Sequence, residues 1–236
     1  MVNDLFHQEK KLLDRGFSYI IGIDEAGRGP LAGPVTAAAV MVRKSQIPNP
    51  KSQKNTNPPV GGQNSNDKNW ELIKDSKMLS AKQREKLYDF IQENFYVGVG
   101  ICDHKTIDRM NILQATYLAM KEALTDLKNK TKHNIFDEKI IILVDGNKQI
   151  PNLSLEQKAI INGDKIVKSI SAASIIAKVT RDRIMLQMHQ KYPEYCFDQH
   201  KGYGTKLHMA MLQKHGPCPI HRQSFQPVKI LAKNRF

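Results

Sequence analysis

Cysteine is scarce in this sequence of 236 residues. The cysteines that occur are odd in number, widely separated and never arranged as a C-x-x-C pair; they are Cys102, Cys196 and Cys218. A chain of this size can bury enough surface to fold without a disulfide or a metal staple. The cysteine usage therefore predicts a protein of a reducing compartment.

Long apolar runs are also lacking. No window approaches the ~18 uninterrupted apolar residues that a membrane-spanning helix needs. The N-terminal stretch MVNDLFHQEKKLLDRGF is charged and contains no apolar segment of the kind found in secretory signals. We therefore expect a cytoplasmic protein that does not contact a membrane.

Acidic residues are a minority among the charged side chains. Lysine and arginine number 36 against 23 aspartates and glutamates, which gives a formal net charge of +13. Such an excess favours a polyanionic partner, usually nucleic acid, although a lysine-rich surface that only aids solubility has the same composition. No Walker-type phosphate loop is present, which argues against a nucleoside triphosphatase.

The pattern of apolar residues predicts an α/β protein. Strands are expected at YIIGI, PVTAAAVMV, YVGVGIC and KIIILVDGN, and a further hairpin or strand at AIINGDKIVKSI. Helices are expected near the N-terminus, after the capping-box pair Ser80 and Gln83, over 106–128 and over 171–190. Residues 43–69 contain almost nothing to bury, and we interpret them as a flexible, low-complexity surface insertion.

Two of the predicted strands end in an acid close to glycine. Asp24 and the adjacent Glu25 follow YIIGI, and Asp145 ends KIIILVD. The carboxyl ends of strands are where α/β sheets gather their ligands, so these acids converge if the two strands are neighbours. Taken alone, either acid is equally compatible with ordinary turn chemistry, because Asp-Gly is a common turn.

A further acid occupies a helix face that should be buried. On a 3.6-residue period Asp182 lies on the apolar stripe of the helix, whereas Arg181 and Arg183 point elsewhere. The other members of this stripe are Ala172, Ile175, Val179 and Leu186. A buried carboxylate needs a partner. Two interpretations stay open: a salt bridge to a lysine or arginine of the sheet, or a fourth ligand in an acidic cluster around a cation.

A cluster of four carboxylates would predict a particular chemistry. Such groups repel one another and raise one another's pKa, and hard divalent cations relieve the conflict because they prefer oxygen ligands. Two such ions stabilise both the attacking and the leaving oxygen of a phosphoryl displacement, so no histidine or serine nucleophile is needed. An acidic site within a basic chain therefore predicts a metal-dependent nuclease.

Long motifs follow one another along the chain in the order GIDEAGRGPLAGPV, DSKMLS, NILQATYLAM, VDGN, ISAASIIAKVTRDR, HKGYGTKLH and GPCPIHRQSF. Together they resemble the type 2 ribonucleases H, and most closely the bacterial ribonuclease HII family. The resemblance covers nearly all of the chain apart from the N-terminal helix, residues 43–69 and the last few residues. It implies a single domain with a ribonuclease H-like fold: a mixed central sheet flanked by helices at about 18–192, and a small helical C-terminal part at about 193–236.

The resemblance also implies an activity. Enzymes of this family cut the RNA strand of RNA–DNA hybrids and cut 5′ to single ribonucleotides in duplex DNA, leaving a 3′-hydroxyl and a 5′-phosphate. This activity serves RNA primer removal and ribonucleotide excision. The implied catalytic and metal-binding acids are Asp24, Glu25, Asp145 and Asp182, which would hold Mn²⁺ or Mg²⁺, two ions during catalysis. We expect a monomer, and the tail VKILAKNRF contains no clear motif for a protein partner.

Further positions match the family's substrate contacts. The turn Gly27-Arg28-Gly29 matches the family's contact to the ribose 2′-hydroxyl, the group that distinguishes RNA from DNA. Tyr203 matches a tyrosine that packs on the sugar just past the ribonucleotide, and Lys77 matches a basic position near the substrate phosphate.

Two positions depart from the family's usual pattern. Met78 stands where a second lysine is more common, and Gln223 replaces the more usual arginine. Neither change touches the acids, so we expect weaker affinity for substrate rather than loss of activity.

Other interpretations are less favoured. His215, Cys218 and His221 have spacings that suggest zinc, but no fourth ligand is evident and the family uses this motif as a structural turn. A protein that only binds hybrids would gain nothing from a self-repelling acidic cluster. A DNA nuclease or an integrase-like transferase is disfavoured by the Gly-Arg-Gly turn together with Tyr203.

Overall fold

The computed structural model describes residues 6–42, 65–73, 76–131 and 138–233. The strands are β1 (Tyr19–Ala26), β2 (Val35–Val42), β3 (Phe95–Cys102), β4 (Ile140–Asp145) and β5 (Glu156–Ile160). The helices are α1 (His7–Asp14), α2 (Ser65–Leu72), α3 (Ala81–Asn94), α4 (His104–Met110), α5 (Ile112–Lys130), α6 (Gly163–Ile166), α7 (Lys168–Lys191), α8 (Phe197–His200), α9 (Lys206–His215) and α10 (Val228–Lys233). Short 3₁₀ turns span Ser76–Met78 and Pro193–Tyr195.

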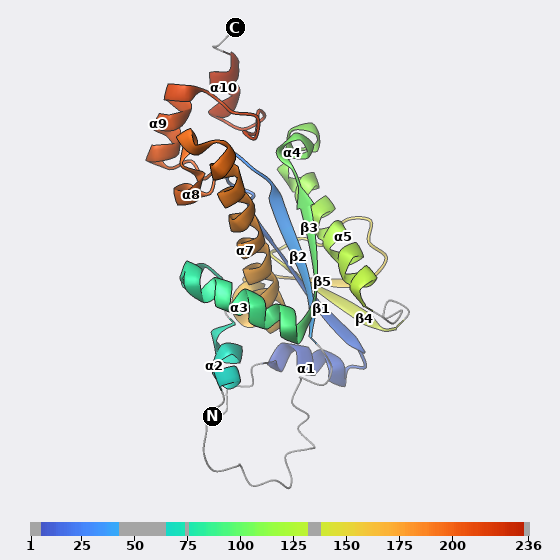
Figure 1. Cartoon of the computed structure of the whole chain (residues 1–236). Helices are drawn as coiled ribbons and strands as arrows, with labels where there is room; N and C mark the ends of the chain where they lie inside the picture. The colour runs from blue at the N-terminus through green and yellow to red at the C-terminus, as the bar shows by residue number, and fades with distance from the viewer. Residues whose placement is uncertain (1–5, 43–64, 74–75, 132–137, 234–236) are drawn as a thin grey trace.

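A mixed five-stranded sheet in the order β3-β2-β1-β4-β5 forms the centre of the molecule (Figure 1). β1 pairs antiparallel with β2 and parallel with β4; β2 pairs antiparallel with β3, and β4 pairs parallel with β5. The predicted α/β fold with a mixed central sheet is thus confirmed. Since β1 and β4 are parallel neighbours, their carboxyl ends lie at the same edge of the sheet.

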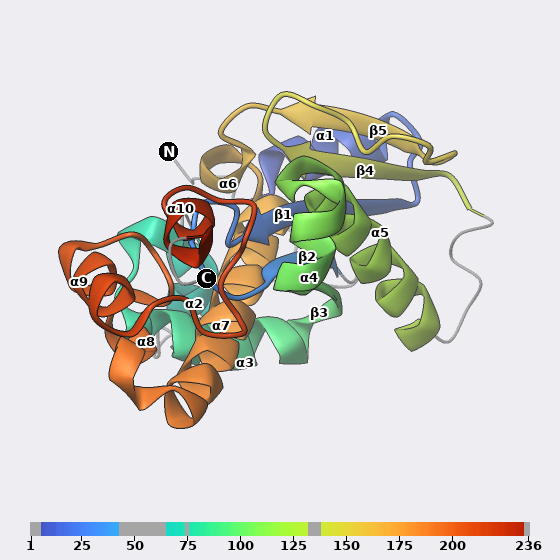
Figure 2. The ribbon, with the colours of Figure 1, turned by 90° about the horizontal axis from the view of Figure 1, so that it is seen from above.

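Helices cover both faces of this sheet. α5 lies along one face, and α7 together with α3 covers the other (Figures 1 and 2). Successive side chains of a strand point to opposite faces. Ile21 and Ile23 of β1 accordingly pack in the core on the α5 side, whereas Ala38 and Val40 of β2 pack in the core that includes α7. The sheet is therefore buried on both faces.

The start of α7 is fixed by two contacts. A Cβ atom added at Gly22 of β1 would lie 2.2 Å from the carbonyl carbon of Ser169, so only glycine allows the helix to come this close. The carboxylate of Glu9 in α1 accepts hydrogen bonds from the backbone N–H (2.9 Å) and the hydroxyl (3.1 Å) of Ser169. A first-turn N–H of α7, which has no partner within the helix, is satisfied in this way. These contacts set where the later turns of α7 meet the edge of the sheet.

The helix predicted over 106–128 is two helices, α4 and α5. Asn111 lies between them with a φ of +71°. Asparagine is one of the few residues that tolerates this left-handed region. Its side chain also accepts hydrogen bonds from the N–H groups of Leu113 (3.0 Å) and Gln114 (3.1 Å), which caps α5. The break therefore has a local cause that apolar periodicity does not reveal. The predicted capping box at the start of α3 is present.

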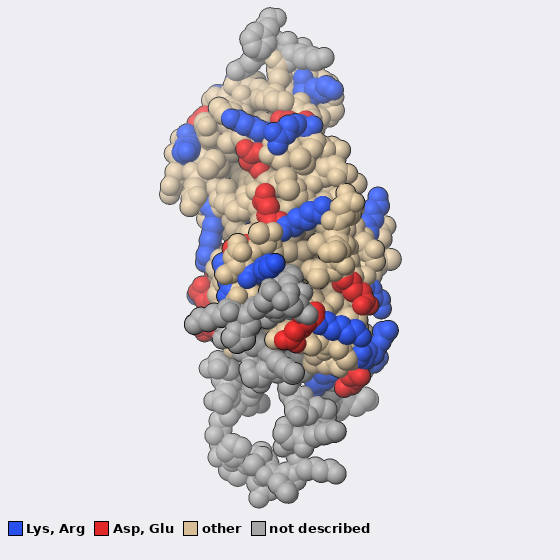
Figure 3. Space-filling model, turned by 90° about the vertical axis from the view of Figure 1, so that its right-hand side faces the viewer, with Lys and Arg blue, Asp and Glu red and all other residues tan. Residues whose placement is uncertain are grey.

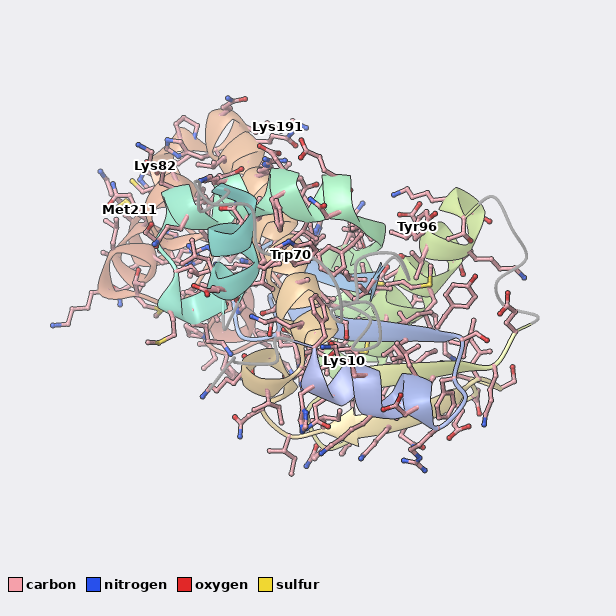
Figure 4. All side chains as sticks on the ribbon, turned by 90° about the horizontal axis from the view of Figure 1, so that it is seen from below. Lys10, Trp70, Lys82, Tyr96, Lys191 and Met211 are labelled. Carbon is pink, nitrogen blue, oxygen red and sulfur yellow. The ribbon has the colours of Figure 1, made fainter. Side chains whose placement is uncertain are left out.

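The insertion predicted over 43–69 is only partly tested. Residues 43–64 lie outside the described residues. The end of the predicted insertion belongs to α2, however, and this helix is packed into the fold. Figure 4 labels Trp70 of α2, whose ring meets those of Phe6 and Phe90 edge-on with centroids 5.6 and 5.0 Å apart. A large aromatic side chain held in this way anchors the helix to its neighbours.

The predicted small helical C-terminal part is also present. α8, α9 and α10 gather at one end of the molecule, beyond the end of α7 (Figure 1). Among the described residues, no helix combines the length and the apolarity needed to cross a bilayer. On the face shown in Figure 3, basic and acidic side chains are interspersed, so the net positive charge is not concentrated in one patch there.

Candidate active site

The acids at the carboxyl ends of β1 and β4 line one pocket of about 260 Å³. Asp24 and Glu25 come from β1, and Asp145 is the last residue of β4. Asp24 is only 5 % exposed. The structure thus brings these predicted acids together, because the two strands are parallel neighbours. The same pocket is lined by the predicted substrate-binding residues, which are Gly27, Arg28, Gly29, Lys77 and Tyr203.

Burial, with repulsion from neighbouring acids, raises the pKa of all three carboxyls. Burial is the main cause at Asp24, where the charges of Glu25 and Asp145 add to it and a hydrogen bond from the Ser174 hydroxyl opposes it. Burial also raises the pKa of Glu25, against the opposing charge of Arg28 at 3.2 Å. The ionised forms of these acids are therefore disfavoured unless a cation compensates them.

Asp164, which was not among the predicted site residues, lies beside Asp145. The residue is 3 % exposed, its N–H donates to Asp145 Oδ1 at 3.3 Å, and its Oδ2 lies 3.3 Å from Lys77 Nζ. The charge of Asp164 is the second cause, after burial, of the raised pKa of Asp145. The sequence signal was the acid in IINGD, just before the long helix. An acid after a glycine turn is common, so that signal is weak on its own.

The structure places Asp182, which was also expected in this cluster, outside the lining of this pocket. Ser174 is the α7 residue that reaches Asp24, and Asp182 follows eight positions later, which at ~1.5 Å per residue is about 12 Å further along the helix. Asp182 lines a neighbouring pocket and pairs with Lys178, with Oδ1 2.7 Å from Nζ. Of the two interpretations, a salt bridge is the one present, although the partner belongs to the same helix and not to the sheet.

Buried Arg222 holds the loop that follows β1. Its side chain is fully buried, and all four of its hydrogen bonds go to main-chain carbonyl oxygens. Nε donates to Gly33 (3.0 Å), Nη1 to Arg28 (3.0 Å), and Nη2 to Gly27 (2.6 Å) and Pro34 (3.1 Å). Burial lowers the pKa of Arg222 to about 9, so the guanidinium stays charged at neutral pH. The carbonyls of the Gly-Arg-Gly turn are thereby drawn inward, away from the pocket.

Arg181 also supports this loop, although the helical period places it off the apolar stripe of α7. It is fully buried and donates to the carbonyl oxygens of Pro34 (3.0 Å), Ala32 (3.1 Å) and Lys201 (2.9 Å). A Cβ atom added at Gly27 would lie 2.2 Å from Arg181 Nε, and the φ of Gly27 is +100°. Both features require glycine at this position of the turn. The Gly-Arg-Gly turn is therefore fitted to a guanidinium beneath it.

Tyr203 stands at the rim of the pocket with 42 % of its surface exposed. The Arg181 guanidinium carbon and Lys178 Nζ lie 5.7 and 5.8 Å from the centre of its ring, within the range of cation–π attraction. Its carbonyl oxygen lies 2.9 Å from Nδ1 of buried His208, whose Nε2 lies 3.0 Å from Nε2 of His221. A buried network thus holds the backbone while the ring faces outward.

Of the three residues whose spacing suggested zinc, His215, Cys218 and His221, only Cys218 and His221 are in contact. Cys218 Sγ lies 3.1 Å from His221 Nδ1, but the other ring nitrogen of His221 faces His208 and not a third ligand of the motif. Within the described ranges, no three or more histidine, cysteine or acidic side chains stand arranged as a preassembled metal site. Among the described residues, the acids of the pocket at β1 and β4 are likewise not preassembled in this way.

The chemistry of the acidic pocket nevertheless suits a hard divalent cation. Its donors are carboxylate oxygens on buried or half-buried side chains, and the pKa values of Asp24, Glu25 and Asp145 are raised. Mg²⁺ and Mn²⁺ prefer such oxygen ligands and supply the charge that the cluster needs. Asp24, Glu25, Asp145 and Asp164 fit this group.

A mixed sheet with an acidic pocket at the carboxyl ends of its central strands, in a basic chain, has the features of polynucleotide hydrolases with a ribonuclease H-like fold. The family model for ribonuclease HII matches residues 21–52 and 68–228. The chain belongs to the ribonuclease HII family. It is accordingly an endoribonuclease that hydrolyses the RNA strand of RNA–DNA hybrids.

Individual relatives agree with this assignment. The chain is 48 % identical to ribonuclease HII of Caldicellulosiruptor bescii over 93 % of its own length and 92 % of the relative's. It is 43 % identical to that of Endomicrobium trichonymphae over 97 % and 95 %. Among solved structures, ribonuclease H2 of Pyrococcus horikoshii matches with a TM-score of 0.64 and 26 % identity, covering 92 % of this chain and 98 % of the other.

Proposed function

We propose that this chain is a divalent-metal-dependent endonuclease that cuts both RNA–DNA hybrids and duplex DNA containing a single ribonucleotide. Cleavage falls on the 5′ side of the ribonucleotide and leaves a 3′-hydroxyl and a 5′-phosphate. The observation that carries the proposal is one pocket that contains the acids of β1 and β4, the Gly-Arg-Gly turn and Tyr203.

The proposed metal ligands are Asp24, Glu25 and Asp145, with Asp164 in the place first expected for Asp182. When bound by these acids, two Mn²⁺ or Mg²⁺ ions would supply the chemistry that activates a water and compensates the charge of the leaving oxygen. The acids of the chain orient these ions, and burial keeps the carboxylates rigid. Ser174 supports this by a hydrogen bond to Asp24.

The proposed role of the Gly27-Arg28-Gly29 turn is to contact the ribose 2′-hydroxyl. Because Arg222 donates hydrogen bonds to the inward-turned carbonyls of Gly27 and Arg28, the backbone of the turn cannot collapse into the pocket. A hydroxyl that both donates and accepts can then be distinguished from a deoxyribose carbon, which does neither. Tyr203 offers an exposed ring on which the next sugar packs.

Lys77 is proposed to contact a substrate phosphate. Its side chain is 79 % exposed at the pocket, and its ammonium lies 3.3 Å from Asp164. The neighbouring Met78 is 80 % exposed and offers no charge to a phosphate at this rim.

The chain is further proposed to act as one domain and as a monomer in the cytoplasm, in RNA primer removal and ribonucleotide excision. Its structured regions share one sheet, and the C-terminal part contributes Tyr203 and Arg222 to the pocket and its support. A separate C-terminal domain would not be expected to complete the site in this way.

The test is cleavage of an end-labelled DNA duplex that contains one ribonucleotide, with Mg²⁺ or Mn²⁺. Wild type should cut once, 5′ to the ribonucleotide, and should leave an all-DNA duplex intact. Asp24→Asn and Asp164→Asn should abolish the cut, whereas Asp182→Asn should retain it. Cleavage of the all-DNA duplex would refute the substrate assignment. Binding without cleavage under either metal would show that the chain has kept the fold but not the chemistry.

A further inference from the structure

A second pocket adjoins the acidic one. It has a volume of about 420 Å³ and lies between the start of α3, the middle of α7 and the chain around α8. Lys178 and Tyr203 line both pockets, so these two side chains form the wall between them. A polymer that leaves the acidic pocket past Tyr203 would enter this second pocket.

The second pocket carries a net positive charge. Arg84 donates to the carbonyl oxygens of Ser76 (3.0 Å) and Leu79 (2.5 Å), and Lys201 donates to the carbonyl of Asp198. Carbonyl groups orient these cations without neutralising them. Of the two acids in the lining, Asp182 pairs with Lys178, and Glu85 pairs with an arginine outside the lining, Arg183. A polyanion therefore meets uncompensated positive charge here.

Lys178 is held between the two pockets by Asp182. Its ammonium lies 2.7 Å from Asp182 Oδ1 and 5.8 Å from the centre of the Tyr203 ring. The side chains of Lys178 and Asp182 are 25 % and 16 % exposed, so both are largely packed in place. A free lysine side chain samples many rotamers, and a carboxylate one helical turn away restricts it.

We propose that Lys178 binds a backbone phosphate of the cleaved strand where that strand passes Tyr203, and that Asp182 is the positioning residue that holds Lys178 there. The second pocket then receives the nucleotide beyond Tyr203. This inference rests on the proposed function, since it requires a nucleic acid strand in the acidic pocket. It gives Asp182 a role that needs no metal.

The proposal predicts a loss of affinity with little change in catalysis. With a duplex containing one ribonucleotide, Lys178→Ala should raise KM about fivefold to tenfold and leave kcat within about twofold. The dependence of log KM on log salt should become shallower by about one, as expected when one phosphate contact is lost. The matched control is Lys191→Ala, which removes the same charge from an exposed position at the end of α7 (Figure 4) and should change neither quantity.

Asp182 is tested through Lys178. Asp182→Ala should raise KM less than Lys178→Ala does, and should add nothing when Lys178 is already alanine. Asp182→Asn keeps an oxygen acceptor for the ammonium and should lie between wild type and Asp182→Ala. The Mn²⁺ concentration for half-maximal activity should stay unchanged in both Asp182 variants. If the role of Asp182 were merely structural, Asp182→Ala would leave the salt dependence of KM unchanged. Its effect would also persist when Lys178 is already alanine.

The phosphate itself is tested with a neutral methylphosphonate at the linkage one nucleotide past the ribonucleotide. It should raise KM for wild type and leave KM of Lys178→Ala unchanged. The proposal is overturned if Lys178→Ala keeps the wild-type KM and salt dependence, or if Asp182→Ala raises the Mn²⁺ requirement. Failure of the proposed function is a separate result: wild type would not cut the duplex, or Asp24→Asn would still cut it.

Discussion

Replacing Arg222 by lysine tests how the loop of the candidate site is supported. The substitution keeps the positive charge but replaces a planar fork by a single ammonium. The guanidinium serves four carbonyl oxygens between Gly27 and Pro34, all from a fully buried position. An ammonium at the end of a flexible chain cannot reach carbonyls arranged around a fork. We therefore expect about two of the four to lose their donor.

The magnitude follows from the cost of a buried polar group without a partner. At about 1–2 kcal/mol for each carbonyl, Arg222→Lys should lower the free energy of unfolding by about 2–4 kcal/mol. For a chain of this size that corresponds to a fall in Tm of roughly 4–16 °C. The variant should remain folded at room temperature, since natural domains are stable by about 5–15 kcal/mol.

The assay is urea unfolding, with the midpoint and the slope compared between variants. Arg109→Lys, an exposed change of the same kind on α4, is the matched control and should stay within about 0.5 kcal/mol of wild type. Cleavage measured well below the Tm should show a lower preference for ribonucleotide over deoxyribonucleotide, because the Gly-Arg-Gly turn is no longer held. If Arg222→Lys is as stable as Arg109→Lys, the hydrogen bonds to the loop are not what fixes it.

Substitutions at three further positions have expected outcomes. Burial, with help from neighbouring acids, raises the pKa of Asp24, so Asp24→Asn should raise the Tm in EDTA and remove the rise that Mn²⁺ gives wild type; a lower Tm in EDTA would contradict this. Glu9→Ala should cost about 1–3 kcal/mol because the N–H and hydroxyl of Ser169 lose their acceptor, whereas Glu9→Gln keeps an oxygen there. Burial also raises the pKa of Glu9 above 4.5, so the wild type loses stability as pH rises through that pKa. In urea unfolding, the free energy of unfolding of Glu9→Gln should therefore increase relative to that of wild type from pH 5 to 7. Parallel pH profiles of the two proteins would refute this. Burial lowers the pKa of His221 from 6.5 to about 3, so only the unfolded chain binds this proton as pH falls below 6.5, and stability is lost at about 1.4 kcal/mol per pH unit. His221→Gln should reduce the slope of the free energy of unfolding against pH by that amount below pH 6.5. An unchanged slope would count against this reasoning.

The convergence of Asp24 and Asp145 could be predicted from the sequence. Each acid ends a run of apolar residues long enough to be a buried strand, and parallel neighbours place their carboxyl ends together. The pairing of the two strands was the single condition, and the fold meets it. The position of each acid can be predicted because the strand, the turn and the acid are adjacent in the chain.

The fourth carboxylate could not be predicted in the same way. Helical periodicity places Asp182 on one stripe with buried residues, but periodicity gives only the direction of a side chain and not its distance along the axis. Asp182 lies too far along α7 to reach β1, whereas Asp164 meets Asp145 because α6 folds back over the end of β4. That return depends on the register of β5 against β4, which no local pattern specifies.

The sequence by itself thus determined the family, four of the five strands of the sheet and the three acids near the ends of β1 and β4, because these depend on residues close together in the chain. Only the tertiary structure decided that Arg181 and Arg222 lie buried beneath the loop after β1. Charged residues are expected at the surface, since burying a charge is costly unless it is hydrogen-bonded. The partners that make burial possible here are main-chain carbonyls, and every residue carries one. The packing of the C-terminal part and α7 against the β1–β2 loop decides which carbonyls face a guanidinium. Composition and residue spacing do not specify this packing.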